Sequence, residues 1–208
     1  MAYKVNAVGA RNLAQSAESI QAKLIQISTD DVFSSASDTP YNEFDDVNPV
    51  GLFAKSKYAG EKFVIQLMTR YVIIRSSWIY GIGKDFLNEV LEAAADPKVS
   101  TMELWNNDRA VPTSAAELAR VVKFFIDNDH YGIYHAVCSG GSCTRLEFAE
   151  EILRLAGKED QLTVTVKDRA PEKYSVLDNM MLRLTGIEEP SGWRETLASY
   201  MKETGGLE

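Results

Sequence analysis

The sequence has 208 residues, of which 45% are hydrophobic and 25% charged, a composition typical of an ordinary globular protein with one sizeable core. The net charge of -8 argues against a nucleic-acid-binding surface, because phosphate binding needs clustered Lys and Arg. No apolar run approaches the roughly 18 residues of a membrane span. The start, MAYKVNAVGARN, also lacks the apolar stretch of a secretory signal, so we expect a cytoplasmic protein with no membrane partner.

Helical and extended patterns alternate along the first part of the chain. Apolar positions recur at helical spacing over residues 5–17, and KLIQIST (23–29) predicts a short buried strand that ends at Ser28 and Thr29. Residues 34–51 are rich in Ser, Asp, Pro, Asn and Gly, which is typical of a surface excursion. A helix over 53–68 follows, and YVIIRSSWIYG predicts a second buried strand that stops at Gly81.

The second part continues the alternation with more helix than strand. A helix is expected over 85–95, and Ser114 opens another one. GIYHAV (132–137) predicts a third strand, and Thr144 with Glu147 forms a capping box for a helix that ends at Gly157. The remaining expected elements are a short strand over 163–166 and helices over 179–184 and 192–201. This order predicts an α/β layered fold with a mainly parallel sheet, in which ligands lie beyond the carboxyl ends of the strands.

Metal and disulfide chemistry find little support in the sequence. Cys138 and Cys143 stand in CSGGSC, whose four-residue gap fits neither a CxxC pair nor a zinc site, so we expect plain loop thiols and no metal. Several loop carboxylates are interpreted as solvated groups or turn formers rather than as a metal cage: Asp30, Asp31, Asp45 and Asp46.

Three motifs carry a specific resemblance. ISTDDVF (27–33), NPVGLFAKSKYAGE (48–61) and RSSWIYG (75–81) resemble the patterns ISTDYVF, NPxxxYGxSKxxGE and RTSWxYG of the dTDP-4-dehydrorhamnose reductase family, within the extended short-chain dehydrogenase/reductase superfamily. All three occur in the family's order, and the similarity covers nearly the whole chain. The resemblance implies an NAD(P)H-dependent ketoreductase that acts on a dTDP-4-keto-6-deoxy sugar.

The resemblance also implies roles for individual residues. Ser28 and Thr29 match the hydroxyl position that binds the substrate ketone, and Lys57 matches the lysine that holds the cofactor ribose and lowers the pKa of a catalytic Tyr. That Tyr position, one helical turn before Lys57, is Phe53. A phenyl ring has no acidic hydrogen, and losing a general acid costs a factor of about 10² to 10⁴ in rate.

A literal YxxxK pattern stands nearby at Tyr58 and Lys62. Tyr58 lies about 140° around the helix from Phe53. We therefore expect Tyr58 to face away from Lys57 and to pack, half-exposed, against a neighbouring element, with Lys62 as a solvated charge.

The nucleotide-binding device of the family is not found in the sequence. No GxxGxxG or GxGxxG turn stands between a strand and a helix, so the resemblance implies an incomplete doubly wound, Rossmann-like sheet whose glycine-rich half is missing. We expect NADPH or NADH in a full-length parent and neither on this chain alone. Residues 1–80 are interpreted as the remaining sheet half, and 81–208 as mainly the substrate-binding portion with one further strand near 132–137. The edge of strand 23–29 would then be unpaired, which predicts a homodimer, pairing through that strand or a displaced N-terminal helix.

For the sugar nucleotide the resemblance points to Trp78, Arg109, Thr113 and Arg169. Core packing remains an alternative for Trp78, as does a plain surface position for Arg109. Two other functions also stay open. Phe53 is also consistent with a non-catalytic regulatory or sugar-nucleotide-binding homologue. A further, lesser alternative is that the chain forms one half of a split protein.

Overall fold

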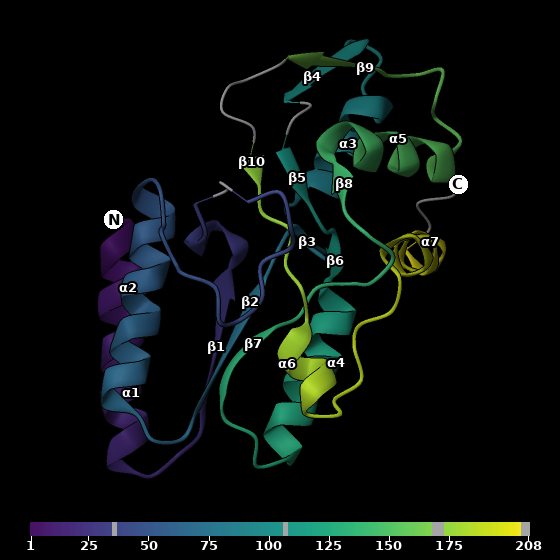
Figure 1. Cartoon of the computed structure of the whole chain (residues 1–208). Helices are drawn as coiled ribbons and strands as arrows, with labels where there is room; N and C mark the ends of the chain where they lie inside the picture. The colour runs from purple at the N-terminus through teal and green to yellow at the C-terminus, as the bar shows by residue number, and fades with distance from the viewer. Residues whose placement is uncertain (35–36, 106–107, 168–172, 205–208) are drawn as a thin grey trace.

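A three-stranded parallel sheet forms the centre of the molecule in a computed structural model, which describes residues 1–34, 37–105, 108–167 and 173–204. Its strands lie in the order β1 (Leu24–Thr29), β2 (Tyr71–Ser76), β7 (Gly132–His135) (Figure 1). Thr29 lies opposite Ser76, and Arg75 lies opposite His135. The carboxyl ends of all three strands therefore meet at one edge, where α/β folds bind their ligands.

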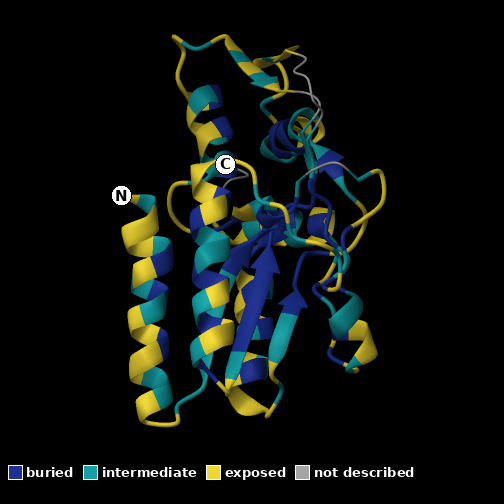
Figure 2. Ribbon diagram, turned by 60° about the vertical axis from the view of Figure 1, so that its left-hand side comes forward, coloured by how far each residue is buried: buried dark blue, intermediate teal, exposed yellow. Residues whose placement is uncertain are grey.

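Helices cover both faces of this sheet. On one face lie η1 (Lys4–Gly9, a π-helical segment), α1 (Ala10–Ser19) and α2 (Leu52–Leu67), and on the other lie α4 (Ala115–Asp127) and α6 (Met180–Leu184). In Figure 2 the strands lie between these layers, with β2 largely buried and the first residues of β1 and β7 only partly buried, while the outer side of α1 is exposed. The predicted α/β class with a parallel, Rossmann-like sheet is confirmed.

Alternating side chains of β2 pack against the helices on the two faces of the sheet. Ile73 packs with Ala14 of α1 and Val64 of α2, whereas Val72 and Ile74 pack in the core built with α4 and α6. This division follows from the period of two along a strand, which sends neighbouring side chains to opposite faces. A strand buried on both faces accounts for the continuous apolar run in its sequence.

The helical segment η1 and helix α2 approach each other closely at Gly60. A Cβ atom on Gly60 would lie 2.2 Å from the carbonyl oxygen of Asn6, so only glycine fits at this crossing. The Asn6 side chain donates to the Ser56 hydroxyl at 2.9 Å, and Ser56 donates in turn to the carbonyl oxygen of Phe53. These contacts fix the first turns of α2 against η1.

The prediction of one strand running to Gly81 is wrong. β2 ends at Ser76, and Trp78 adopts a positive φ of 40° that turns the chain. The following β3 (Ile79–Tyr80) belongs to another sheet, where it pairs with β6 (Thr113–Ser114). The apolar run hides this break because both segments are rich in β-formers.

A second core lies between three further helices, and is centred on Phe148 and Trp193. These helices are α3 (Phe86–Ala95), α5 (Arg145–Ala156) and α7 (Trp193–Glu203). The predicted capping box of Thr144 and Glu147 is present, and Gly157 ends α5 with a φ of 62°. Both predictions are confirmed because the stop and start signals are local.

Short strands surround this second core. β4 (Thr101–Trp105) pairs in parallel with β9 (Thr163–Lys167), as an outlying ribbon at the top of Figure 1. β5 (Asp108–Ala110) lies between β8 (Cys143–Thr144) and β10 (Lys173–Tyr174). Of these, only β9 was predicted. The strands β5, β8 and β10 have two or three residues and leave no periodic pattern to recognise, whereas the five-residue β4 was missed.

The surface excursion after β1 is anchored to the sheet. It follows the short 3₁₀ segment η2 (Asp30–Val32), and its Tyr41 ring stacks on Phe33 with 4.3 Å between ring centroids. The Glu43 carboxylate accepts from the backbone N–H of His135 at 2.8 Å. Within the described ranges, no helix is long and apolar enough to cross a membrane, and no group of three or more metal-ligating side chains occurs.

Candidate functional site

The carboxyl end of β1 carries the hydroxyl residues that were predicted from the motif. Thr29 caps η2, and its Oγ1 accepts from the backbone N–H of Asp31 at 3.2 Å. The same hydroxyl donates to Oδ1 of Asp30 at 3.2 Å. Ser28 is buried, and its Oγ has no hydrogen-bond partner in the described part of the chain. Both hydroxyls thus lie at the sheet edge, and the Ser28 hydroxyl is unsatisfied.

Lys57 projects from α2 onto this strand. Its Nζ donates to the carbonyl oxygen of Ile27 at 2.6 Å, two residues before Thr29. Burial lowers the pKa of Lys57, and the negative charge of Glu61, one turn further along α2, opposes that shift. The ammonium is therefore held at the strand rather than in solvent.

Phe53 lies one turn before Lys57 on the same helix and is 52% exposed. The exposed phenyl ring has no acidic hydrogen and therefore cannot act as a proton donor. Tyr58, by contrast, is half-buried against the second core, and the Lys62 ammonium lies 5.2 Å from its ring centroid. The expected packing role of Tyr58 is confirmed.

A buried ion pair holds α2 against β2. Arg75 donates to Glu61 with an Nη2 to Oε2 distance of 2.8 Å, and both side chains are almost fully buried. The Arg75 guanidinium also lies 5.3 Å from the ring centroid of Phe33. The pair fixes the part of α2 that follows Lys57.

Asp30 contradicts the interpretation of the loop carboxylates as solvated. It is only 4% exposed, and its Oδ2 accepts from the Ser175 hydroxyl at 2.5 Å. Burial, reinforced by the charge of Asp31, raises the pKa of Asp30 to about 6, against the opposing effects of Ser175, Lys173 and Thr29. Asp31 itself pairs with Lys173 at 2.5 Å.

Trp78 lies beneath an arginine that sequence reasoning missed. The Arg145 guanidinium lies 3.8 Å from the Trp78 ring centroid and 4.5 Å from that of Phe86. Burial lowers the pKa of Arg145 to about 10, and the nearby carboxylates of Asp30 and Asp108 oppose the shift. Within the described residues, no hydrogen bond or ion pair satisfies this guanidinium, so its N–H groups remain available to an anionic ligand.

The other predicted substrate residues occupy different environments. Arg109 on β5 is partly exposed and lies 3.9 Å from Glu147. Thr113 on β6 is fully buried, and its hydroxyl donates to the carbonyl oxygen of Val111 at 3.2 Å. Arg169 lies outside the described residues. The structure thus brings Ser28, Thr29 and Lys57 together, with Arg109 and Thr113 in the neighbouring small sheets.

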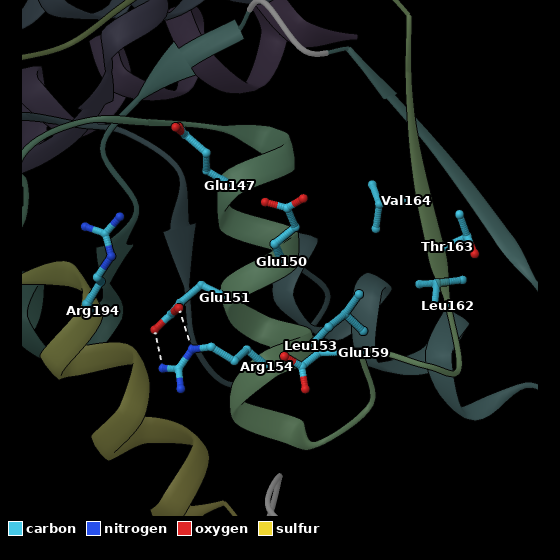
Figure 3. A pocket seen from close by; sticks show the side chains of 10 residues that line it. All are labelled: Glu147, Glu150, Glu151, Leu153, Arg154, Glu159, Leu162, Thr163, Val164 and Arg194. Atoms are coloured by element: carbon cyan, nitrogen blue, oxygen red, sulfur yellow. Dashed lines mark hydrogen bonds and ion pairs between the residues drawn. The ribbon is translucent and has the colours of Figure 1, made fainter.

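A separate hollow of about 630 Å³ lies beside α5 (Figure 3). Glu147, Glu150 and Glu151 line it, and Arg194 of α7 stands across from them. None of the predicted site residues lines this hollow. Its acidic wall is unsuited to a sugar nucleotide, whose diphosphate is an anion.

Asp30 and Arg145 carry weak sequence signals. Asp30 belongs to the STD motif, but its burial depends on Ser175, which is 145 residues away in the sequence. Arg145 is the first residue of α5, and nothing in the sequence near it indicates that its guanidinium lies against Trp78.

Comparison with known proteins identifies the family of the chain. The chain matches the family model described as "RmlD substrate binding domain" over residues 1–205. It is 35% identical to the Spore coat polysaccharide biosynthesis protein SpsK of Bacillus subtilis, with 97% of this chain and 72% of the relative covered. It is 30% identical to the dTDP-4-dehydrorhamnose reductase of Mycobacterium tuberculosis, with 97% and 69% covered.

Solved structures extend the agreement to three dimensions. A dTDP-4-dehydrorhamnose reductase from Clostridium acetobutylicum superposes with a TM-score of 0.90 at 38% identity, with 98% of this chain and 73% of that chain covered. The enzyme of the same name from Bacillus anthracis, in complex with NADP, gives 0.90 at 34% identity, with 97% and 73% covered. The chain therefore belongs to the RmlD substrate binding domain family, within the extended short-chain dehydrogenase/reductase superfamily.

Proposed function

We propose that this chain is the catalytic-strand and substrate-binding portion of an NAD(P)H-dependent reductase of a dTDP-4-keto-6-deoxy sugar. The observation that carries this proposal is the contact between Lys57 and the carbonyl oxygen of Ile27. It places a desolvated ammonium beside the strand whose end bears Ser28 and Thr29. The relatives of this chain include proteins named dTDP-4-dehydrorhamnose reductase.

On this proposal the chain's own residues prepare the ketone. Thr29 donates a hydrogen bond to the ketone oxygen, and the buried, unsatisfied Ser28 hydroxyl offers a second donor at the same edge. Lys57 holds the ribose of the nicotinamide cofactor and adds positive charge near the oxygen that becomes an alkoxide. A reduced nicotinamide, when bound, supplies the hydride.

Lys57 fits the ribose of a nicotinamide cofactor at this edge, but the sequence has no glycine-rich turn for the pyrophosphate. We therefore propose that the cofactor needs a further nucleotide-binding portion and does not bind this chain alone.

The substrate side of the site is proposed to comprise Trp78, Arg109, Thr113 and Arg169, with Arg145 added. Arg145 and Arg109 supply positive charge for the diphosphate. Thr113 is buried, so its contribution would be to fix the turn through Val111 rather than to touch the sugar.

The free edge of β1 supports a proposal about assembly. Among the described strands, only β2 pairs with β1, so the opposite row of backbone groups has no strand partner. Such edges favour pairing with another chain, and we propose a homodimer or pairing through residues 23–29. Light scattering at several protein concentrations measures this, and a monomer at every concentration contradicts it.

Phe53 favours a second candidate, a non-catalytic protein that binds a sugar nucleotide. The two candidates differ in turnover by the complete protein, measured as NAD(P)H oxidation that depends on the 4-keto sugar. The reductase proposal predicts slow turnover that rises in Phe53→Tyr, by up to about 10² to 10⁴-fold. If neither protein oxidises NAD(P)H in the presence of the ketone, the reductase proposal fails.

A further inference from the structure

The phenyl ring of Phe53 leaves the proposed reduction without an obvious source for its proton. Hydride addition to a ketone carbon puts the former π electrons on oxygen, and the resulting alkoxide needs one proton. Tyr58 packs against the second core, and Tyr80 is buried with a hydrogen bond to the Thr196 hydroxyl at 2.9 Å. Neither phenol lies beside Thr29 in the contacts of the described residues.

We propose that Asp30 supplies this proton through the hydroxyl of Thr29. The two side chains are in hydrogen-bond contact, with 3.2 Å between Thr29 Oγ1 and Asp30 Oδ1. Asp30 is only 4% exposed, and the Ser175 hydroxyl fixes its other oxygen at 2.5 Å. The inference rests on the reductase function proposed above.

Hydrogen counting explains why the carboxyl must be protonated. A hydroxyl has one hydrogen and two lone pairs. With Asp30 ionised, the single hydrogen of Thr29 is directed to Asp30, and the Asp31 N–H occupies one lone pair. With Asp30 protonated, Asp30 donates to the second lone pair, and the Thr29 hydrogen turns to the ketone oxygen.

The proton transfer balances as two linked steps. As the hydride of the reduced nicotinamide bonds to the ketone carbon, the Thr29 hydrogen moves to the ketone oxygen. The Asp30 hydrogen moves to Thr29 Oγ1, so the products are an alcohol, an oxidised nicotinamide, neutral Thr29 and an Asp30 carboxylate. Solvent then returns one proton to Asp30.

The surroundings of Asp30 suit a carboxyl that exchanges protons near neutral pH. Burial and the neighbouring Asp31 carboxylate raise the pKa of Asp30 to about 6, while Lys173 and the Ser175 and Thr29 hydroxyls restrain the rise. Among the described residues, the Arg145 guanidinium also interacts electrostatically with Asp30. Both protonation states are therefore populated within a pH unit or so of 6.

The direct test is the pH dependence of turnover in the complete protein, with dTDP-4-dehydrorhamnose and NADPH. We expect kcat to rise as pH falls through about 6. Asp30→Asn keeps the shape and loses the proton, so kcat should fall by about 10² to 10⁴-fold and lose its pH dependence. Ser175→Ala removes a hydrogen bond to the carboxylate and should move the profile to higher pH. The exposed Asp46→Asn is the surface control.

The variant Phe53→Tyr distinguishes a failure of this proton relay from a failure of the proposed reductase function. With the phenol restored, Asp30→Asn should have a much smaller effect, because the proton no longer comes from Asp30. An independent readout is the ¹³C NMR titration of the Asp30 carboxyl in the wild-type chain, with an expected midpoint near 6. The relay is overturned if that midpoint lies near 4, the usual value. It is also overturned if Phe53→Tyr turns over while the wild type is inactive or indifferent to Asp30→Asn.

Discussion

The ammonium of Lys57 lies 2.6 Å from the carbonyl oxygen of Ile27 and so joins helix α2 to the strand that ends at Thr29. A hydrogen bond from a charged donor contributes about 1.5 to 3 kcal/mol. We expect Lys57→Met to lower the free energy of unfolding by about 1 to 3 kcal/mol, measured by urea denaturation. Lys55→Met, an exposed position on the same helix, should leave it nearly unchanged. Equal effects of the two substitutions would contradict the contact.

The Glu61–Arg75 pair predicts a larger loss of stability. Both side chains are buried, so Glu61→Ala leaves the Arg75 charge without a counterion. Breaking a buried pair on one side costs about 3 to 5 kcal/mol. The exposed pair of Lys123 and Asp127 is the matched control, and Asp127→Ala should cost about 0 to 1 kcal/mol. Similar unfolding midpoints for both variants would contradict the burial of the Glu61–Arg75 pair.

Gly60 predicts a steric effect where η1 crosses α2. The Cβ of Gly60→Ala would meet the Asn6 carbonyl oxygen at 2.2 Å, so a backbone must shift. Overpacking of this kind costs about 1 to 3 kcal/mol. Gly9→Ala places its Cβ at an ordinary 3.6 Å from the Lys4 oxygen and should be neutral or slightly stabilising. The melting temperatures of Gly60→Ala and Gly9→Ala, measured by thermal unfolding, test this difference.

These predictions rely on features that the sequence reveals to different degrees. The strands β1 and β2 and helix α2 were predictable, because apolar runs and the spacing of Phe53 and Lys57 involve residues that are close in the sequence. The break at Trp78 was not, because a positive φ at a non-glycine residue has no signature within an apolar run. The burial of Asp30 depends on Ser175, and the position of Arg145 depends on Trp78 and Phe86, which are distant in sequence.

His135 predicts a loss of stability in acid. Its ring is fully buried, and its Nδ1 lies 3.1 Å from the carbonyl oxygens of Tyr41 and Asp178. Burial, with the charge of Arg75, lowers the pKa of His135 from 6.5 to about 3. The unfolded chain therefore gains a proton at higher pH than the folded chain, and stability falls as pH drops from 6.5 towards 3.

The measurement for His135 is the free energy of unfolding as a function of pH. In His135→Gln the group that titrates is gone, so the slope between these pH values should be smaller than in the wild type. An unchanged slope would place the acid sensitivity in other groups. Asp30 acts with the opposite sign, because its raised pKa favours the folded state as pH falls from about 6.

Arg145 predicts a loss of ligand affinity without loss of fold. Its guanidinium has aromatic contacts to Trp78 and Phe86 and is proposed to meet the diphosphate. Removing one charge-assisted hydrogen bond, worth about 1.5 to 3 kcal/mol, should weaken dTDP-sugar binding about 10- to 100-fold in Arg145→Gln. Arg154→Gln, on the same helix and paired with Glu151, is the control. Isothermal titration calorimetry measures both, and equal affinities would remove Arg145 from the site.

The most direct measurement of the sugar-nucleotide assignment is an NMR titration of the isotope-labelled chain with a dTDP-sugar. The account predicts saturable shifts at the amides of Ser28 and Thr29 and at the indole of Trp78, with little change beside the acidic hollow at α5. Shifts confined to that hollow, or none at millimolar ligand, would contradict the claim that the carboxyl edge of β1 and β2 binds this substrate.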